Sequence, residues 1–445
     1  MLTPVASSVI ADVSSAQHVR QCGFAVAAVA KHIPTASMGS DTALLRPTTH
    51  PSKKLTGCPY LCLYHYVLRS LLIRISVTLL LAFCLLLPAT GPGSAVDIPA
   101  ETIRIAIVKN AASVVVDGDG LLARRENGDA VPLAPPVTIR PGDNGLTIDG
   151  VIYRRLSFAG AGSLLVNGKP YRGMADVVSS DRGILIVNEL PLEDYLVGLI
   201  NCEISSAWPM EAVKAQAVIA RTYALYRRKL RMNTPYHLES SVLDQVYNGS
   251  LIEDSRARRA VSETSGQVLT HNGSVIQAFY HSNCGGKTEA SENVWGMSLP
   301  YLRGVSCEYC QGNPSSVWTQ KLELAQIEER LRAAGFRVAA VNDIRPGPLN
   351  SRGRLKQVTI VSTGGDLTLT GDQFRKVLGY GVIKSTNFSV RVKDGAAHFS
   401  GLGNGHGVGL CQWGAKQRAL AGFSYTEILT YYYPGTVLEQ FFDIR

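Results

Sequence analysis

Residues 188–221 read NELPLEDYLVGLINCEISSAWPMEAVKAQAVIAR, and helical signals begin within this stretch. Pro191 opens one short helix and Pro209 a second, because proline and acidic side chains are favoured in the first turn of a helix. The second helix carries a series of small side chains, which indicates close packing against another element: Ala212, Ala215, Ala217, Ala220 and Ala224. The stretch therefore divides the chain into a part before it and a part after it.

Glu203 lies between these two helices, in a turn beside Trp208. Partial burial next to an aromatic side chain raises the pKa of a carboxyl group, which suits a general acid. The alternative interpretation is an ordinary carboxylate at a helix end or on the surface.

Short apolar runs broken by Gly, Pro or Asn precede the helices, beginning with the alternating Ile103, Ile105 and Ile107. This pattern predicts a β-rich module of short strands. After the stretch, the sequence predicts a helix over 324–331 ended by Gly335, strands over 356–393 around a helix near 374–378, and helices near 415–421 and 425–432. Strands and helices do not alternate regularly, so we expect an α+β fold, in which the β-rich module precedes a mixed helix/strand domain.

Residues 75–87, ISVTLLLAFCLLL, are an uncharged run of signal-peptide length, with Arg69 and Arg74 before it and Gly93-Ser94-Ala95 after it. We expect a signal peptide over 67–95 that exports the rest of the chain to the periplasm, cell envelope or exterior. An uncleaved anchor is the alternative, and either one is the only membrane attachment that we expect. Residues 1–66 are interpreted as a non-native or disordered extension from an over-extended gene start.

The formal net charge is +9, but it is unevenly distributed. Residues 1–95 hold seven Lys or Arg and two Asp or Glu, and the other 350 residues hold 37 and 33. Sequence-independent binding to phosphates needs clustered cations, so no nucleic-acid partner is expected.

Two later stretches carry candidate chemistry. In Gly403–Gly414, GNGHGVGLCQWG, glycines surround His406 and permit close approach of the backbone to a ligand; the alternative is a hairpin whose histidine caps a turn. The second set is His281, Cys284, Cys307 and Cys310, whose two-residue gaps suit a tetrahedral structural zinc. Disulfides or free thiols remain alternatives, and residues 96–445 hold an odd number of cysteines, five.

Taken together, these stretches resemble the stage II sporulation protein D (SpoIID) / LytB amidase-enhancer domain family. The resemblance rests on ordered motifs: the stretch quoted above, continued to Leu225; DQVYNG from Asp244; FYHSNCGGKTEASENVWG from Phe279; PYLRGV from Pro300; FRKVLG from Phe374; and residues 403–436. It spans about residues 170–437, so we expect a β-rich module over 96–170 and the family's peptidoglycan-acting domain over 171–440.

The resemblance implies a lytic transglycosylase that cleaves glycan strands, often stripped of peptides, with Glu203 as the single catalytic acid and base. The family's usual Glu-Met-Pro reads Glu203-Ile204-Ser205 here, and Cys411 replaces the family's serine. Some members bind zinc through the stretch that matches 281–310. We expect substrate contacts from Trp208, Arg221, His406, Gln412 and Trp413. The competing prediction is a non-catalytic peptidoglycan-binding enhancer of an N-acetylmuramoyl-L-alanine amidase.

Overall fold

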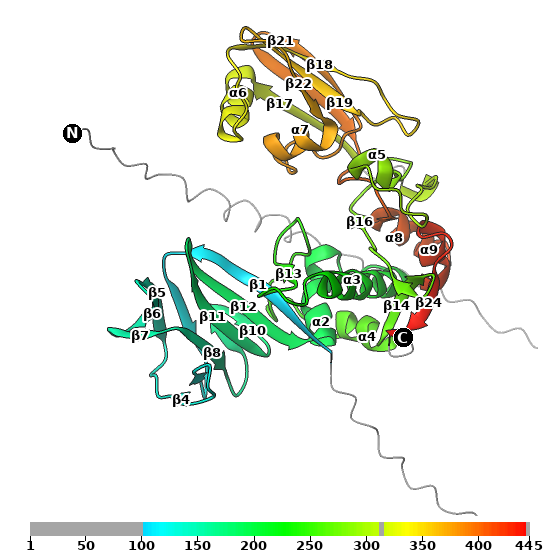
Figure 1. Ribbon diagram of the computed structural model, residues 1–445. Coiled ribbons are helices and arrows are strands. Elements are labelled where there is room, and N and C mark those ends of the chain that lie inside the picture. The colour runs from blue at the N-terminus through cyan, green and yellow to red at the C-terminus, as the bar shows by residue number, and fades with distance from the viewer. Residues whose placement is uncertain (1–100, 311–315, 442–445) are drawn as a thin grey trace, which may run out of the picture. The chain divides into compact units, whose positions relative to one another are not determined.

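Two long antiparallel strands, β1 (Thr102–Ala111) and β12 (Gly183–Pro191), pair with each other in the first sheet of the computed structural model (Figure 1). The structure describes residues 101–310 and 316–441. The predicted extension 1–66 and signal peptide 67–95 lie outside the described residues.

The N-terminal strands form a seven-stranded sheet of order β13-β1-β12-β11-β8-β3-β4 and a six-stranded sheet of order β10-β9-β2-β5-β6-β7. Their alternating apolar residues face one core, which the alternation of Ile103 and Ile105 predicts. The remaining strands are β2 (Val114–Asp117), β3 (Leu122–Arg124), β4 (Ala130–Val131), β5 (Val137–Gly142), β6 (Gly145–Ile148), β7 (Val151–Tyr153), β8 (Arg155–Ala159), β9 (Leu164–Val166), β10 (Lys169–Tyr171), β11 (Met174–Ser180) and β13 (Leu238–Glu239).

The expected boundary at residue 170 does not coincide with an edge of this sheet. Strand β11 pairs with β8 on one side and with β12 on the other, and β12 pairs with β1. The β-rich part therefore continues to Pro191, where α2 begins. The reason is that the hydrophobic core needs β11 and β12, which contribute Val177, Ile184 and Ile186 to it.

Helices α2 (Leu192–Glu203), α3 (Met210–Leu230) and α4 (Ser255–Glu263) follow, and the predicted helix starts after Pro191 and Pro209 are confirmed. The charges of α3 favour it, because Glu211 lies in its first turn and Arg227, Arg228 and Lys229 lie in its last. Its five alanines are all buried, so the expected close packing is found.

A second core lies around the C-terminal half of the chain and includes part of α3. In this region β16 (Tyr280–His281) pairs in parallel with β23 (Leu410–Cys411). At Gly409, which has a φ of 73°, a Cβ atom would meet the Phe279 carbonyl oxygen at 1.9 Å, so only glycine allows this approach.

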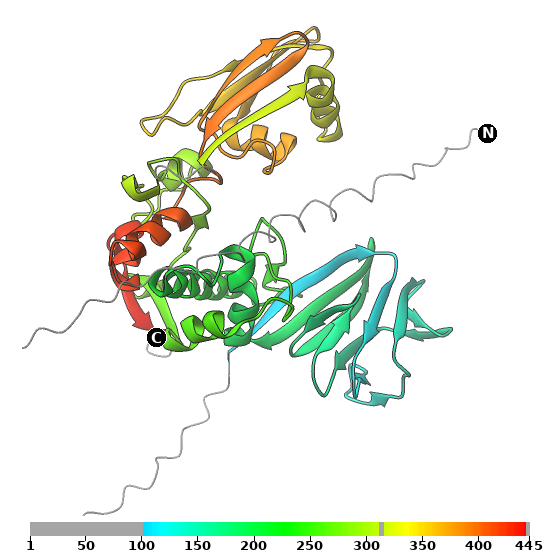
Figure 2. The ribbon, with the colours of Figure 1, turned by 180° about the vertical axis from the view of Figure 1, so that it is seen from behind.

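The other elements of this region are β14 (Gln267–His271), β15 (Ser274–Val275), α5 (Ser291–Trp295), a 3-10 turn (Glu308–Cys310), α8 (Gln412–Leu420), α9 (Tyr425–Tyr432) and β24 (Val437–Gln440). Figure 2 shows α8 and α9 in red beside α3.

A third core belongs to a segment inserted between residues 316 and 403. It contains two three-stranded sheets and two helices: β17 (Val317–Glu323), α6 (Leu324–Ala333), β18 (Val341–Pro346), β19 (Gln357–Ser362), β20 (Leu367–Thr370), α7 (Gly371–Leu378), β21 (Phe388–Lys393) and β22 (Ala396–Leu402). The predicted helix before Gly335 and the short helix near 374–378 are both confirmed.

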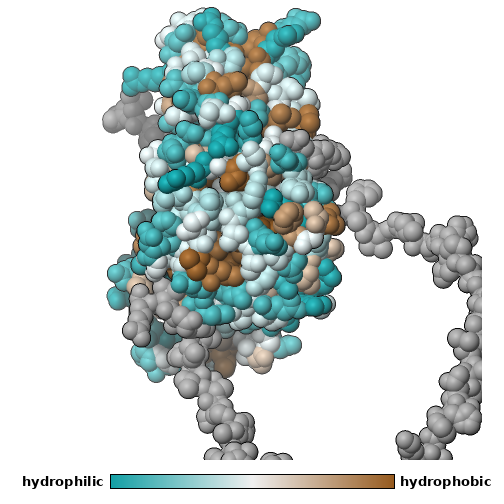
Figure 3. All heavy atoms as spheres, turned by 90° about the vertical axis from the view of Figure 1, so that its right-hand side faces the viewer, coloured by the Kyte–Doolittle hydropathy of each residue, from teal (hydrophilic) through white to brown (hydrophobic). Residues whose placement is uncertain are grey.

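The fold is α+β, as the mixture of strand and helix signals predicts. Within the described ranges, no helix is both long enough and apolar enough to cross a membrane. On the face drawn in Figure 3, hydrophobic residues form small separate patches among hydrophilic ones.

Gly198 of α2 provides a test of this packing. Alanine normally stabilises a helix relative to glycine, by about 1 kcal/mol. Here an added Cβ atom would lie 2.5 Å from the Gly249 carbonyl oxygen and 2.8 Å from the Tyr247 ring. We therefore expect Gly198→Ala to lower the free energy of unfolding by about 1–3 kcal/mol, measured by urea denaturation. Gly381→Ala, with no atom within 4 Å of its added Cβ, is the control; an equally stable Gly198→Ala protein would contradict the packing argument.

Candidate functional site

Glu203 is the last residue of α2 and is half-buried. The main-chain N–H of Val246 donates to its Oε1 at 3.1 Å. The side chains of Tyr280 and Gln412 also hydrogen-bond to this carboxyl group. Three segments that lie far apart in the chain therefore meet at one carboxyl group: a loop after β13, strand β16 and the first turn of α8.

The surroundings of Glu203 raise its pKa to about 7. Burial is the main cause, because removal from water penalises the charged carboxylate, and the hydrogen bonds from Val246, Tyr280 and Gln412 oppose this effect only in part. A large fraction of Glu203 is therefore protonated at neutral pH. A group whose pKa is close to the working pH can both give and take a proton, which is the requirement for general acid–base catalysis.

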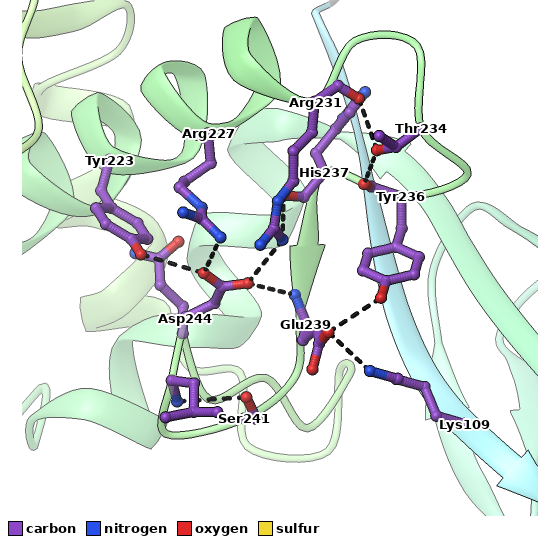
Figure 4. A network of polar contacts seen from close by, with 12 residues as sticks. Lys109, Tyr223, Arg227, Arg231, Thr234, Tyr236, His237, Glu239, Ser241 and Asp244 are labelled. Carbon is purple, nitrogen blue, oxygen red and sulfur yellow. Dashed lines mark hydrogen bonds and ion pairs between the residues drawn. The ribbon is translucent and has the colours of Figure 1, made fainter. Parts of the chain in front are cut away.

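The loop that supplies Val246 is held by Asp244, whose side chain is 5% exposed. Its carboxylate forms an ion pair with Arg227 at 2.8 Å and accepts hydrogen bonds from Arg231 at 3.1 Å and from the main-chain N–H of Glu239 at 3.0 Å (Figure 4). The Tyr223 hydroxyl completes the set at 3.2 Å. Two arginines at the end of α3 therefore fix the loop two residues before its contact with Glu203.

Gln245 connects this loop to Tyr280. Its Oε1 accepts a hydrogen bond from the Tyr195 hydroxyl at 3.1 Å, and its Nε2 donates to the Tyr280 oxygen at 3.2 Å. Burial raises the pKa of both tyrosines well above the usual value, so both keep their protons. Because the Tyr280 oxygen already accepts from Gln245, its own proton is directed towards Glu203.

Trp208 and Trp413 form an aromatic pair with ring centroids 5.2 Å apart. Trp208 lies in the turn after Glu203, and Trp413 follows Gln412 in the chain. Two of the predicted substrate contacts therefore lie together, one in the turn after Glu203 and one beside Gln412. Both side chains are partly exposed and are accessible to a ligand.

Arg221, another predicted substrate contact, lies elsewhere. It is 1% exposed, and its guanidinium pairs with Glu193 through two hydrogen bonds of 2.7 Å. It also donates to the carbonyl oxygens of Gln267 and Val261. Arg221 therefore ties α3 to α2, α4 and β14, and it has almost no surface left for a saccharide.

His406 lines a cavity of about 370 Å³ whose other walls include Glu289, Trp295, Arg354 and Arg375. Its ring lies 5.1 Å from the Trp295 ring, centroid to centroid. Burial, together with the two nearby arginines, lowers its pKa to about 3, so the ring is neutral at pH 7. It hydrogen-bonds the main chain of Tyr280, which links the cavity to the residue that contacts Glu203.

Four buried cysteines form a second cluster: the ligand atoms of Cys284, Cys307, Cys310 and Cys411 lie within 4.8 Å of one another. Four zinc-bound thiolates at 2.3 Å from the metal would lie about 3.8 Å apart, so this set suits a tetrahedral metal. Hydrogen bonds from Cys284 and other thiols lower the pKa of Cys310, which favours the thiolate form. No disulfide bond joins these four cysteines in the structure.

The fourth member of this cluster differs from the prediction, which assigned His281. The His281 ring hydrogen-bonds the Val408 carbonyl through Nδ1 at 3.1 Å, and the cluster contains Cys411 in its place. The parallel pairing of His281 with Cys411 explains the exchange, because it brings β23 beside the cysteines that follow β16.

The stage II sporulation protein (SpoIID) family model matches residues 180–271. An uncharacterized protein of Brachyspira hyodysenteriae is 35% identical over 287 residues, which cover 64% of this chain and 77% of that protein. Stage II sporulation protein D of Bacillus subtilis is 29% identical over 273 residues, covering 57% of this chain and 76% of that protein.

This chain belongs to the SpoIID family. The amidase enhancer of Bacillus subtilis is also similar, at 31% identity over 294 residues, which are 55% of this chain but only 40% of that protein. The segment that the SpoIID model matches contains Glu203 and the loop that binds it.

Sequence reasoning did not assign roles to Tyr280, Gln245, Val246 or Cys411. Gln245 and Val246 lie within the motif DQVYNG, and Tyr280 within FYHSNCGG, so the family motifs contain them. The contacts of Val246 and Tyr280 with Glu203, of Gln245 with Tyr280, and of Cys411 with the other cysteines depend on long-range packing, which no local sequence pattern predicts.

The raised pKa of Glu203 makes a prediction about stability. Below about pH 4 the carboxyl is protonated in both the folded and the unfolded chain. Between about pH 4 and 7 the unfolded carboxyl ionises first, so the folded state loses stability as the pH rises. Glu203→Gln has no such group. Its free energy of unfolding relative to the native protein should therefore increase by about 3 kcal/mol from pH 4 to pH 8, measured by urea denaturation at each pH. A difference that is the same at every pH would show that Glu203 has an ordinary pKa.

Proposed function

We propose that this protein is a peptidoglycan lytic transglycosylase in which Glu203 acts first as acid and then as base. The observation that carries the proposal is a half-buried carboxyl with a pKa of about 7, held by hydrogen bonds from three separate segments. Membership of the SpoIID family and the amidase-enhancer relative support the coarser statement, a peptidoglycan-related role.

The chemistry fits one carboxyl group. Protonated Glu203 donates to the glycosidic oxygen that follows an N-acetylmuramic acid unit, and the glycosidic bond breaks. The resulting carboxylate then takes the proton of the C6 hydroxyl as that oxygen bonds to C1, which closes a 1,6-anhydro ring. No water is consumed, and Glu203 ends protonated.

A hydrolase would normally need a second carboxylate. Two acids of this region, Asp244 and Glu211, are already engaged by other groups. Asp244 is bound by two arginines, and Glu211 accepts from Lys214 at 3.2 Å and from the Tyr425 N–H at 2.8 Å. This supports transglycosylation over hydrolysis.

Sugar rings stack on Trp208 and Trp413 in this proposal, because aromatic faces suit the apolar faces of pyranoses. Gln412 holds the catalytic carboxyl, and His406 offers a neutral ring to the cavity beside Tyr280. The protein acts outside the cytoplasmic membrane, where its substrate lies. The expected signal peptide over 67–95 supports this location.

The same proposal includes one structural zinc bound by Cys284, Cys307, Cys310 and Cys411. Four protein ligands leave no open position, so the metal stabilises the fold and takes no part in the reaction.

The second candidate function is a non-catalytic enhancer of a cell-wall amidase, and the relative of that name favours it. In that case the protein would bind peptidoglycan and stimulate the amidase without cleaving glycan.

Catalysis is tested with peptide-stripped glycan and mass spectrometry of the products. The native protein should release fragments with a 1,6-anhydro end, lighter by one water than hydrolysis products. Glu203→Gln keeps the size of the side chain but cannot cycle a proton, so we expect turnover to fall by at least roughly 100- to 10,000-fold. Near-normal turnover in this variant, or products with water added, would sink the mechanism. No cleavage together with stimulation of an amidase would favour the enhancer.

The zinc proposal is tested on protein purified from a reducing cytoplasm. Metal analysis should give about one zinc per chain. Cys411→Ser should lose the metal and several kcal/mol of stability, since structural zinc contributes directly to folding. His281→Ala should retain the metal, because His281 lies outside the cysteine cluster. Zinc loss in His281→Ala with retention in Cys411→Ser would restore the original assignment.

A further inference from the structure

Lys416 lies on α8 above the aromatic pair formed by Trp208 and Trp413. Its ammonium nitrogen is 5.0 Å from the centroid of the Trp208 ring and 4.5 Å from that of the Trp413 ring. The side chain is neither fully buried nor fully exposed. A fixed positive charge therefore stands beside two partly exposed aromatic faces.

Among the residues that the structure describes, Lys416 has no carboxylate partner. Two other lysines of the chain do have such partners: Lys214 binds Glu263 at 2.6 Å, and Lys109 binds Glu239 at 2.7 Å. Contact with aromatic rings stabilises a cation only partly and leaves the N–H donors of the ammonium without an anionic acceptor. The group is thus able to bind an anion brought by a ligand.

Lys416 is also close along the chain to Gln412, one of the residues that hydrogen-bond the catalytic carboxyl. It lies four residues after Gln412 on α8, which places the two side chains on the same face of the helix, one turn apart. Gln412 hydrogen-bonds Glu203, and Trp208 lies in the turn that follows Glu203. The lysine and the two tryptophans therefore lie on the two segments that flank Glu203.

We propose that Lys416 binds the free lactyl carboxylate of an N-acetylmuramic acid unit whose ring stacks on Trp208 and Trp413. The inference rests on the proposed function, since it assumes a glycan at this site. N-acetylmuramic acid differs from N-acetylglucosamine by its lactyl ether. When a stem peptide is attached, the lactyl carboxyl is a neutral amide, and when the peptide has been removed it carries a negative charge.

This assignment makes Lys416 a specificity-determining residue. A charge-assisted hydrogen bond to an ammonium is stronger than a neutral one, so the stripped glycan gains an interaction that the peptide-bearing glycan lacks. The compact charge of lysine suits a single carboxylate that moves with the sugar ring. Glu203 cleaves whichever bond lies beside it, and Lys416 selects the strand.

The test measures binding and not turnover. Glu203→Gln protein is titrated calorimetrically with an oligosaccharide of N-acetylglucosamine and N-acetylmuramic acid that has free lactyl carboxylates. The second ligand is the same oligosaccharide with its carboxylates converted to methylamides. We expect the free acid to bind roughly 10-fold more tightly at low salt, and the preference to shrink as salt screens the charge.

Adding Lys416→Met to the Glu203→Gln protein should lower the affinity for the free acid to that for the amide, with the amide affinity unchanged. Lys416→Arg should keep the preference, because it retains the charge. Lys393→Met is the matched control. Lys393 is 72% exposed and lies on β21, in the segment between residues 316 and 403, so its replacement should change neither affinity.

Three results overturn the proposal: equal affinity for the two oligosaccharides, no measurable binding of either, or an equal loss for both in Lys416→Met. The last would mean that Lys416 only supports the aromatic pair. Binding in the Glu203→Gln protein does not depend on catalysis. A preference for the free acid that disappears in Lys416→Met upholds the Lys416 assignment even if the native protein releases no anhydro products, and the lytic mechanism then fails alone.

Discussion

The rest of the site depends on the partial burial of one carboxyl group. Desolvation raises the pKa of Glu203, while the donors around it lower that pKa, and the result of about 7 reflects a balance between the two. A fully solvated Glu203 would be ionised at neutral pH and unable to donate a proton. Additional hydrogen-bond donors or a nearby cation would also lower its pKa and leave it ionised. The groups that hydrogen-bond to this carboxyl are all neutral. The two arginines and the aspartate beside the loop that binds Glu203 neutralise one another a short distance away.

The Asp244 cluster is the clearest example of this pairing. Two arginines and a buried aspartate lie next to the loop that binds Glu203, yet their charges are satisfied by one another (Figure 4). Removal of one member of such a buried cluster leaves an uncompensated charge, which is far more costly than the net gain from the intact cluster. We interpret the cluster as a device that fixes the loop without placing a cation against Glu203. Gln245 and the Val246 N–H, both uncharged, make the actual approach to the site.

Local signals account for what the sequence could predict. Prolines in the first turns place the starts of α2 and α3, and Gly335 marks the end of α6, because these residues act within one or two turns of the backbone. Glu203 was identified by its place between two helices and by the family motif. Its partners could not be found in this way, because Val246 lies 43 residues away and Tyr280 and Gln412 lie on other elements. Arg221 looked equally available in the sequence, and only the packed structure shows that Glu193 occupies it.

The cysteine cluster was also only partly predictable from local sequence signals, and it lies on the same chain segments as the partners of Glu203. The two-residue gaps of His281-x2-Cys284 and Cys307-x2-Cys310 favour local pairs, so a ligand 127 residues from Cys284 was not expected. Yet Cys411 precedes Gln412, and Cys284 follows Tyr280 by four residues, so the cluster joins the two segments that supply side-chain donors to Glu203. Strands β16 and β23 share only two residue pairs, which is little backbone hydrogen bonding to hold them in register. Four sulfurs around one metal would hold that register more firmly than the strands do alone. The metal would then influence the pKa of Glu203 through the positions of Tyr280 and Gln412, without contacting the substrate.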